Sequence, residues 1–157
     1  MGREEVYNSV ATGISMLGLY MNQVIENQGL EKALDYWNKV GYIFGSGRVA
    51  TLKEKYGDKT PSPEELKDVL SDDMTGFGSD FEIIIDSESV DTTIKQCAIH
   101  QGLSMAGFDN ALIAQFCQNV SQGELKAMTS AYPKLAPYCV PRTSADGVCK
   151  EGYKIKK

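Results

Sequence analysis

The sequence contains no long apolar run. A helix that crosses a bilayer needs about 20 consecutive apolar residues, and here every apolar stretch is interrupted by polar residues or glycine. A secretory signal would begin with basic residues followed by an uninterrupted apolar run. Instead Glu4 and Glu5 come early, and Thr12 and Gly13 break the apolar stretch that starts at Val10. We therefore predict a cytoplasmic protein with no membrane partner.

Basic charge is also scarce. The net charge is −5 and the pI is about 4.9. A domain that binds nucleic acid usually presents a basic face, because Lys and Arg must neutralise the phosphates. The one concentration of lysines is at the C-terminal end, which is typical of a solvated terminus: Lys150, Lys154, Lys156 and Lys157. We predict no nucleic-acid partner.

The sequence has one histidine and no Cys-x-x-Cys motif. It does contain four cysteines, which fall on the C-terminal half: Cys97, Cys117, Cys139 and Cys149. In a cytosolic chain with an adequate core, two disulfides are the weaker interpretation. Free thiols, metal ligands and small buried side chains are the alternatives that remain.

The length and composition are those of one globular domain. A chain of 157 residues can bury roughly 70% of its unfolded surface and needs no disulfide to stabilise its core. Hydrophobic residues make up 42% and charged residues 24%, which excludes a disordered chain. We predict a single domain over 1–157, with a helical part over 1–72 and a mixed α/β part over 80–157.

Apolar residues recur at helical spacing in the first part. The run from Val6 to Val24 predicts a helix that ends at Gly29. A second helix follows from Leu30, with a bend or break expected at Gly45–Gly47. These glycines lack the strand and the Lys-Ser/Thr of a phosphate loop, so close helix packing or a kink is the better interpretation. The apolar face of the helix from Val6 to Val24 either forms the interface of a homodimer or packs within the chain. We favour packing within the chain, because the run is shorter than three heptads.

A third helix has a clear start. Ser62 is a good N-cap, Pro63 suits the first helical position, and Glu65 completes a capping box. We expect this helix to end near Leu70 and a loop to follow over 72–79. The carboxylates in and after that stretch are interpreted as solvated turns.

In the second part, the spacing of the apolar residues changes from that of helices to that of strands. The segments 81–85 and 90–96 predict two antiparallel strands. We then expect one or two helical turns over 100–106, a helix capped by Asp109, and a further helix from Gly123 to Ala131. The segments 138–142 and 147–155 predict a closing hairpin. The fold class is α+β: an antiparallel sheet with the C-terminal helices packed on it and an N-terminal helical arm.

Cys97 and His100 form the first candidate site. Their spacing places the sulfur and the imidazole on one face of a helical turn. A thiolate needs a basic or positive neighbour to be a nucleophile at neutral pH, and histidine is the usual one. The same two side chains are also suitable zinc ligands. The structural alternative is a hydrogen-bonded histidine beside a core cysteine.

The other cysteines have their own alternatives. Cys117 lies on an apolar helical face, where buried packing is the default. Cys139 and Cys149 fall on the two strands of the predicted hairpin, as a cross-strand pair or as metal ligands. A zinc or iron site would draw on Cys97, His100, Cys117 and Cys149, as an alternative to the nucleophile.

The C-terminal sixty residues carry a recognisable pattern. Its parts are Cys97, the small-residue turn that ends at Gly107, Phe116-Cys117, the Tyr132-Pro133 break, Arg142, and Gly147-Val148-Cys149 leading into a strand. In this pattern the chain resembles the L-2-amino-thiazoline-4-carboxylic acid hydrolase family. The resemblance implies hydrolysis of a C–N or C–S bond in a nitrogen heterocycle. Cys97 would be the nucleophile or a metal ligand, and Arg142 would bind a substrate carboxylate with Cys117 nearby. His100 is added as proton shuttle on its spacing alone.

The same half also resembles the 4-vinyl reductase small-molecule-binding domain, which closes with a similar hairpin. That resemblance implies a second function, a small-molecule-binding or sensor domain without turnover. The two alternatives differ in their thiols. An enzyme needs an accessible Cys97 of low pKa, whereas a binding domain needs an apolar cavity with inert thiols.

Overall fold

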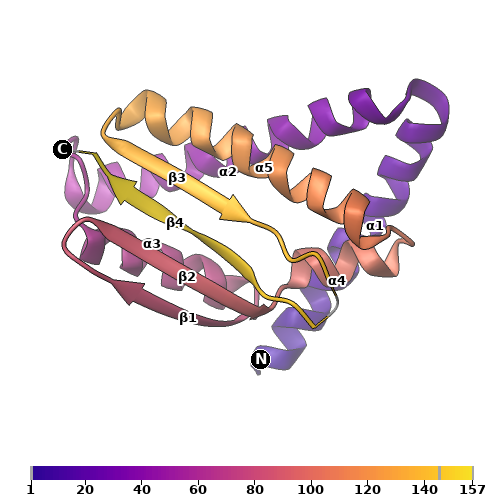
Figure 1. The fold of residues 1–157 in the computed structure, drawn as a ribbon, viewed down its shortest axis with the longest axis horizontal. Coiled ribbons are helices and arrows are strands. Elements are labelled where there is room, and N and C mark those ends of the chain that lie inside the picture. Colours follow the sequence, from indigo (N-terminus) through magenta and orange to yellow (C-terminus); the bar gives the residue numbers. More distant parts are fainter. Residues whose placement is uncertain (1, 145, 157) are drawn as a thin grey trace.

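The computed structural model describes residues 2–144 and 146–156. Its elements follow one another as helices, a strand pair, two helices and a second strand pair (Figure 1). They are α1 (Arg3–Gln28), α2 (Leu30–Tyr56), α3 (Pro63–Gly76), β1 (Asp80–Ile85), β2 (Ser89–Gln96), α4 (Ala98–Met105), α5 (Asn110–Ala131), β3 (Leu135–Val140) and β4 (Cys149–Ile155). The predicted α+β class with an antiparallel sheet is confirmed.

The sheet has four strands in the order β1-β2-β4-β3, and every neighbouring pair is antiparallel. Both predicted hairpins are present. They join through β2 and β4, so that Ile94 lies opposite Cys149. β4 is therefore an inner strand, and its inward side chains lie in the middle of the molecule.

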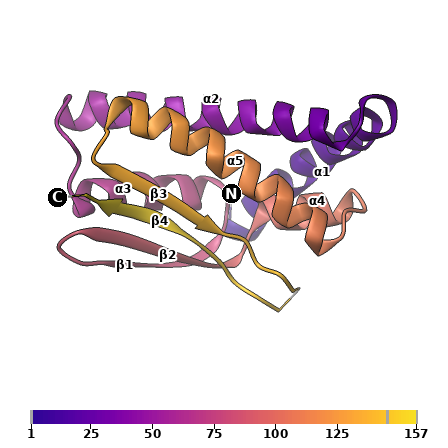
Figure 2. The same cartoon turned by 45° about the horizontal axis from the view of Figure 1, so that its top comes forward.

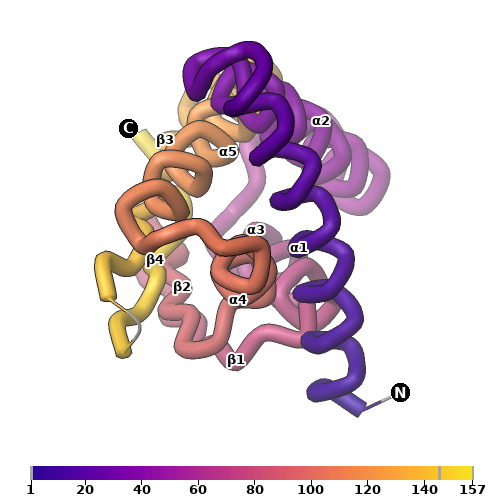
Figure 3. Tube along the Cα trace, turned by 90° about the vertical axis from the view of Figure 1, so that its right-hand side faces the viewer, coloured from indigo at the N-terminus to yellow at the C-terminus, as the bar shows by residue number. Residues whose placement is uncertain are grey.

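The helices form layers over one face of the sheet (Figure 2). α3 packs on β1 and β2, while α5 lies against α2, and α1 packs on α4. Figure 3 shows α4 between α1 and the strands. The prediction of an N-terminal arm is therefore wrong, because α1 and α2 are built into the body by their contacts with α4 and α5.

Helix ends match the local signals in the sequence. Gly29 ends α1 with a φ of 89°, which glycine adopts without strain. Ser62 Oγ accepts a hydrogen bond from the backbone N–H of Glu65, and the Glu65 carboxylate accepts one from the backbone N–H of Ser62. The predicted capping box is therefore confirmed. The side chain of Asp109 accepts from Leu112 and starts α5 as predicted.

Three predicted interruptions are absent from the described helices. α2 runs through Gly45 and Gly47 without a break, α5 runs through Gly123, and α3 continues to Gly76 where a loop was expected. Glycine lowers helix propensity by about 1 kcal/mol. In α2 and α5 the glycines allow the two helices to touch, and this tertiary packing outweighs the propensity.

The apolar face of α1 is used within the chain. A Cβ on Gly18 would lie 2.6 Å from the Cβ of Ala106, and one on Gly102 would lie 2.5 Å from the backbone oxygen of Ala11. The favoured intrachain packing is thus what the structure has. A homodimer through the N-terminal helices stays a prediction, and it would have to use the opposite face, where Met16 and Leu19 are exposed. In the described part of the chain, no helix is long and apolar enough to cross a membrane.

Candidate functional site

The body encloses a cavity between the helices and the sheet. Its main part has a volume of about 270 Å³ and adjoins a smaller part of about 70 Å³. Most lining side chains of the main part are apolar and come from α1, α2, the end of α3, β2 and α5, among them Ile14, Leu17, Val40, Phe44, Met74 and Val120. The volume is close to the lower end of the range for small-molecule sites, about 300 Å³.

Three glycines bring α2 and α5 into backbone contact beside this cavity. A Cβ on Gly41 would lie 2.0 Å from the oxygen of Val120, and one on Gly45 would lie 2.9 Å from the Cα of Glu124. On α5, a Cβ on Gly123 would lie 2.0 Å from the oxygen of Asn38. The predicted close packing is therefore confirmed at Gly45 but not at Gly47, which has open space around it. The contact places the next turn of α2 against α5.

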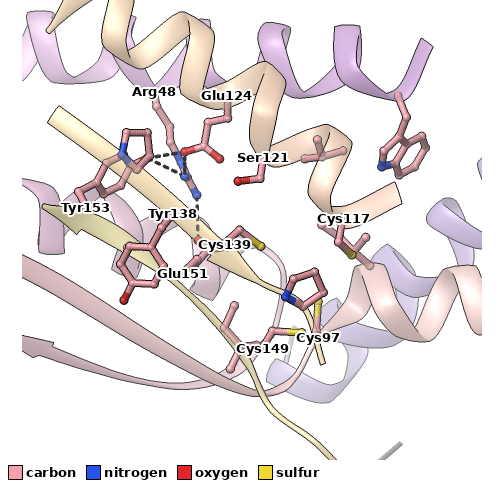
Figure 4. A pocket seen from close by; sticks show the side chains of 17 residues that line it. Arg48, Cys97, Cys117, Ser121, Glu124, Tyr138, Cys139, Cys149, Glu151 and Tyr153 are labelled. Atoms are coloured by element: carbon pink, nitrogen blue, oxygen red, sulfur yellow. Dashed lines mark hydrogen bonds and ion pairs between the residues drawn. The ribbon is translucent and has the colours of Figure 1, made fainter. Parts of the chain in front are cut away.

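Arg48 occupies that next turn and is the centre of a buried charge cluster. Its side chain is 5% exposed and lies 4.7 Å from the ring centroid of Phe44. Nε donates to Asp73 at 2.5 Å, and Nη1 donates to Glu124 and, at 2.9 Å, to the hydroxyl of Tyr153. Figure 4 shows the guanidinium between Glu124 and the strand that carries Tyr153.

Glu151 is a looser member of the same cluster. Its Oε1 lies 3.5 Å from Nη2 of Arg48. Burial raises the pKa of Glu151 to about 7, with Glu124 adding to the rise, while Arg48 opposes it. Burial alone would lower the pKa of Arg48, but Tyr153 and the carboxylates outweigh it and raise that pKa well above its ordinary value. The cluster therefore holds a permanent cation and one carboxyl that titrates near neutrality.

All four cysteines are free and line the smaller part of the cavity. They come from four elements: Cys97 caps α4, Cys117 lies on α5, Cys139 on β3 and Cys149 on β4 (Figure 4). The helical and strand periods explain this convergence. α5 presents Cys117 and Glu124 seven residues apart on one face, and β4 presents Cys149, Glu151 and Tyr153 on alternate positions.

Cys149 is the thiol with thiolate character. The Cys97 thiol donates a hydrogen bond to it, and Nε of Arg142 donates at 3.4 Å, so the pKa of Cys149 falls to about 5 despite its burial. The pKa of Cys97 is raised well above its ordinary value by the same hydrogen bond and by burial. Burial also raises the pKa of Cys117, to about 12, and that of Cys139. One ionised thiol is thus held among three neutral ones.

His100 lies apart from these sulfurs. Its Nε2 is hydrogen-bonded to Oδ1 of Asn110 at 3.1 Å, and its backbone N–H donates to Cys97. The imidazole is not among the groups that line either part of the cavity. The structure therefore joins His100 to Cys97 through the backbone, while the predicted proton transfer through its ring has no geometric support.

The metal alternative named Cys97, His100, Cys117 and Cys149 as ligands of zinc or iron. Three of these line one cavity and His100 does not. Within residues 2–144 and 146–156, no group of three or more His, Cys, Asp or Glu side chains is placed to hold a metal ion. We therefore derive no chemical step through a metal. The metal site stays a prediction that elemental analysis of the purified protein would test.

Arg142 and Cys139 take positions that differ from their predicted roles. The Arg142 guanidinium is 8% exposed, and Nη2 donates to the backbone oxygens of Ile94 at 3.1 Å and Lys95 at 2.9 Å. Binding of a substrate carboxylate by Arg142 stays a prediction, but Nε and Nη2 already have partners within the chain. Cys139 lies opposite Glu151 in the hairpin, so it is a diagonal neighbour of Cys149 and not its direct cross-strand partner.

The sequence analysis missed the carboxylate end of the cavity. Arg48, Glu124 and Glu151 attracted no attention because each is an ordinary charged residue in an amphipathic element. The alternation of Cys149, Glu151 and Tyr153 was a usable signal, since it places an acid between two inward side chains on an inner strand. Comparisons with protein-family models and with curated proteins give no match for this chain. The two resemblances in the cysteine pattern therefore stay proposals.

Proposed function

We propose that this chain is a small-molecule-binding domain whose ligand occupies the internal cavity. The observation that supports it most is the cavity itself, which is mostly apolar and is lined by side chains from five helices and the sheet. A tightly packed interior leaves few voids larger than water. A void of about 270 Å³ is unusual for a domain of this size unless something fills it.

The protonation state of Cys97, which the sequence analysis proposed as nucleophile, also favours binding over turnover. An enzyme that uses Cys97 needs it ionised, yet burial and its hydrogen bond to Cys149 hold Cys97 protonated. A protonated Cys97 is expected of a binding domain such as the 4-vinyl reductase domain that the chain resembles, whereas the lowered pKa of Cys149 is not part of that expectation. The proposal is independent of whether the ligand is later modified.

The sole tryptophan provides the test. Trp37 lines the cavity, so its fluorescence should respond when a ligand enters. Hexanol is a suitable probe, because apolar cavities of comparable size bind small apolar molecules. We expect a saturable change in emission with the native protein.

Two alanine variants localise that response. Ala98→Leu adds three carbons at a residue that lines the cavity and is 1% exposed, so it should abolish the response. Ala50→Leu makes the same change at an exposed position of α2 and should leave the response intact. No saturable response in the native protein, or an unchanged response in Ala98→Leu, would contradict the proposal.

A second candidate function is a cysteine-dependent hydrolase acting on a C–N or C–S bond, as the first resemblance implies. The observation that favours it is the low pKa of Cys149, supported by Cys97 and Arg142. The nucleophile would then be Cys149, with Cys97 as proton donor and Arg142 as the positioning residue. Turnover of a thiazoline substrate that is lost in Cys149→Ser and retained in Cys139→Ser would support this candidate. Equal turnover in both variants would refute it.

A further inference from the structure

The carboxylate end of the cavity carries more negative than positive charge. Asp73, Glu124 and Glu151 all contact the single guanidinium of Arg48. Asp73 and Glu124 make the close ion pairs, so three acids share the one positive charge of Arg48. Glu124 also accepts a hydrogen bond from Tyr153. Glu151 has the weakest partner, with 3.5 Å to Nη2 of Arg48 and no other side-chain contact of this kind among the described residues.

The cavity also reaches Glu151. It lines both parts of the cavity, together with Arg48 and Glu124. Its surroundings offer no second cation to balance it. The titratable groups packed around this end come from α2, α3, α5, β3 and β4: Arg48, Asp73, Cys117, Glu124, Tyr138, Cys139, Cys149 and Tyr153. The Glu151 side chain is 23% exposed, and a partly buried carboxylate that lacks a full partner has a raised pKa.

A second and independent group in the same wall lacks a partner. The indole Nε1 of Trp37 is buried and donates no hydrogen bond, while the residue is only 2% exposed. Trp37 lines both parts of the cavity. Its ring is held by an edge-on contact with Phe116, with centroids 5.4 Å apart. A buried donor without an acceptor costs about 1–3 kcal/mol, which a ligand oxygen or nitrogen would recover.

We propose that the ligand is an apolar molecule that carries one cationic nitrogen, which pairs with Glu151, and a hydrogen-bond acceptor for Nε1 of Trp37. This inference rests on the proposed binding function and names its ligand class. An ammonium or amidinium group would supply the missing positive charge. The apolar body would fill the space lined by α1, α2 and α5.

Ligands of other charge fit this end less well. An anion would meet two or three carboxylates and one guanidinium, whose Nε and Nη1 already donate to Asp73, Glu124 and Tyr153. A neutral apolar molecule would fill the space but leave Glu151 without a partner. The cavity should therefore rank three probes of the same length in one order: hexylammonium first, hexanol second and hexanoate last.

The experiment is a fluorescence titration of the native chain with these three probes. A charge-assisted hydrogen bond is stronger than a neutral one by an amount that corresponds to roughly tenfold in affinity. We therefore expect hexylammonium to bind roughly tenfold more tightly than hexanol. Glu151→Gln keeps the shape and removes the charge, so it should abolish this preference.

A matched control separates the local effect from the net charge. Glu82→Gln removes the same charge from the exposed face of β1, where Glu82 pairs with Lys95. It should retain the full preference for hexylammonium. If Glu151→Gln fails to fold, the native protein gives the same test. Lowering the pH below about 7 protonates Glu151, so the preference should fall there.

The outcomes separate this inference from the function on which it rests. If hexanol binds and hexylammonium shows no preference, or if the preference survives in Glu151→Gln, the cationic ligand class is refuted and the binding function stands. If none of the three probes produces a saturable response, the binding function itself fails. A preference lost in Glu151→Gln and kept in Glu82→Gln supports both.

Discussion

Replacing Arg48 tests the charge cluster most directly. Arg48→Met keeps most of the apolar stem of the side chain but removes the one cation that, within residues 2–144 and 146–156, forms ion pairs with Asp73, Glu124 and Glu151. Removing one partner of a buried ion pair costs about 3–5 kcal/mol, because the remaining charge is left without compensation. A domain is stable by about 5–15 kcal/mol in total. We therefore expect Arg48→Met to lose a large share of its stability at neutral pH and to remain folded.

The loss should depend on pH in a defined direction. Without Arg48, which lowers the pKa of Glu151, the folded state should bind protons more tightly at Glu151 than the unfolded chain does. Stability then rises as pH falls, because the folded state takes up more protons. The difference between Arg48→Met and the native protein should therefore shrink from pH 7 toward pH 5. A double variant with Glu151→Gln should recover part of the loss, since the two residues are in contact.

Urea unfolding monitored by the fluorescence of Trp37 is the assay. The matched control is Lys95→Met, which removes an exposed cation from its pair with Glu82 on the other face of the sheet. Exposed pairs contribute little to stability. A loss in Arg48→Met no larger than that in Lys95→Met, or a loss independent of pH, would refute the argument that this cluster is a buried ionic network.

Two further predictions concern the thiols and the helix contact. The ultraviolet absorbance of thiolate should titrate near pH 5, disappear in Cys149→Ser and move to higher pH in Arg142→Met, because Arg142 stabilises the ionised sulfur. A titration near the ordinary thiol pKa would contradict this. Gly123→Ala should destabilise by about 1–3 kcal/mol in urea, since it pushes two backbones apart. Gly47→Ala, with open space around it, should stabilise by up to about 1 kcal/mol.

The features that the sequence predicted correctly are local ones. Gly29, Ser62 and Asp109 mark helix ends through hydrogen bonds to residues within four positions, so the pattern of neighbours is enough to find them. The strands were equally readable from their composition and turns. Helix breaks were predicted wrongly at Gly45 and Gly123. Each glycine packs against the backbone of the other helix, and this contact between distant parts of the chain keeps both helices continuous.

The charge cluster, in contrast, is held together by contacts between residues far apart in the sequence. Arg48 meets Asp73 across 25 residues, Glu124 across 76 and Glu151 across 103. Such contacts follow from how α2, α3, α5 and β4 assemble, and no local spacing encodes them. The cysteines could be noticed because the residue type is rare and chemically distinctive. Their convergence on one cavity was anticipated only in part, since Cys97 was paired with His100 and not with Cys149.

The two ends of the cavity differ in charge balance, and this difference constrains how a ligand would lie. At the thiol end the thiolate of Cys149 has Arg142 as its counter-ion, so that end is close to neutral. At the other end Glu151 lacks a full partner beside Arg48. A cationic ligand would therefore place its charge near Glu151 and extend its body toward the thiols. An ammonium preference that depends on Glu151 would establish this orientation without deciding between the two candidate functions. Turnover that depends on Cys149 is then the observation that separates an enzyme from a binding domain.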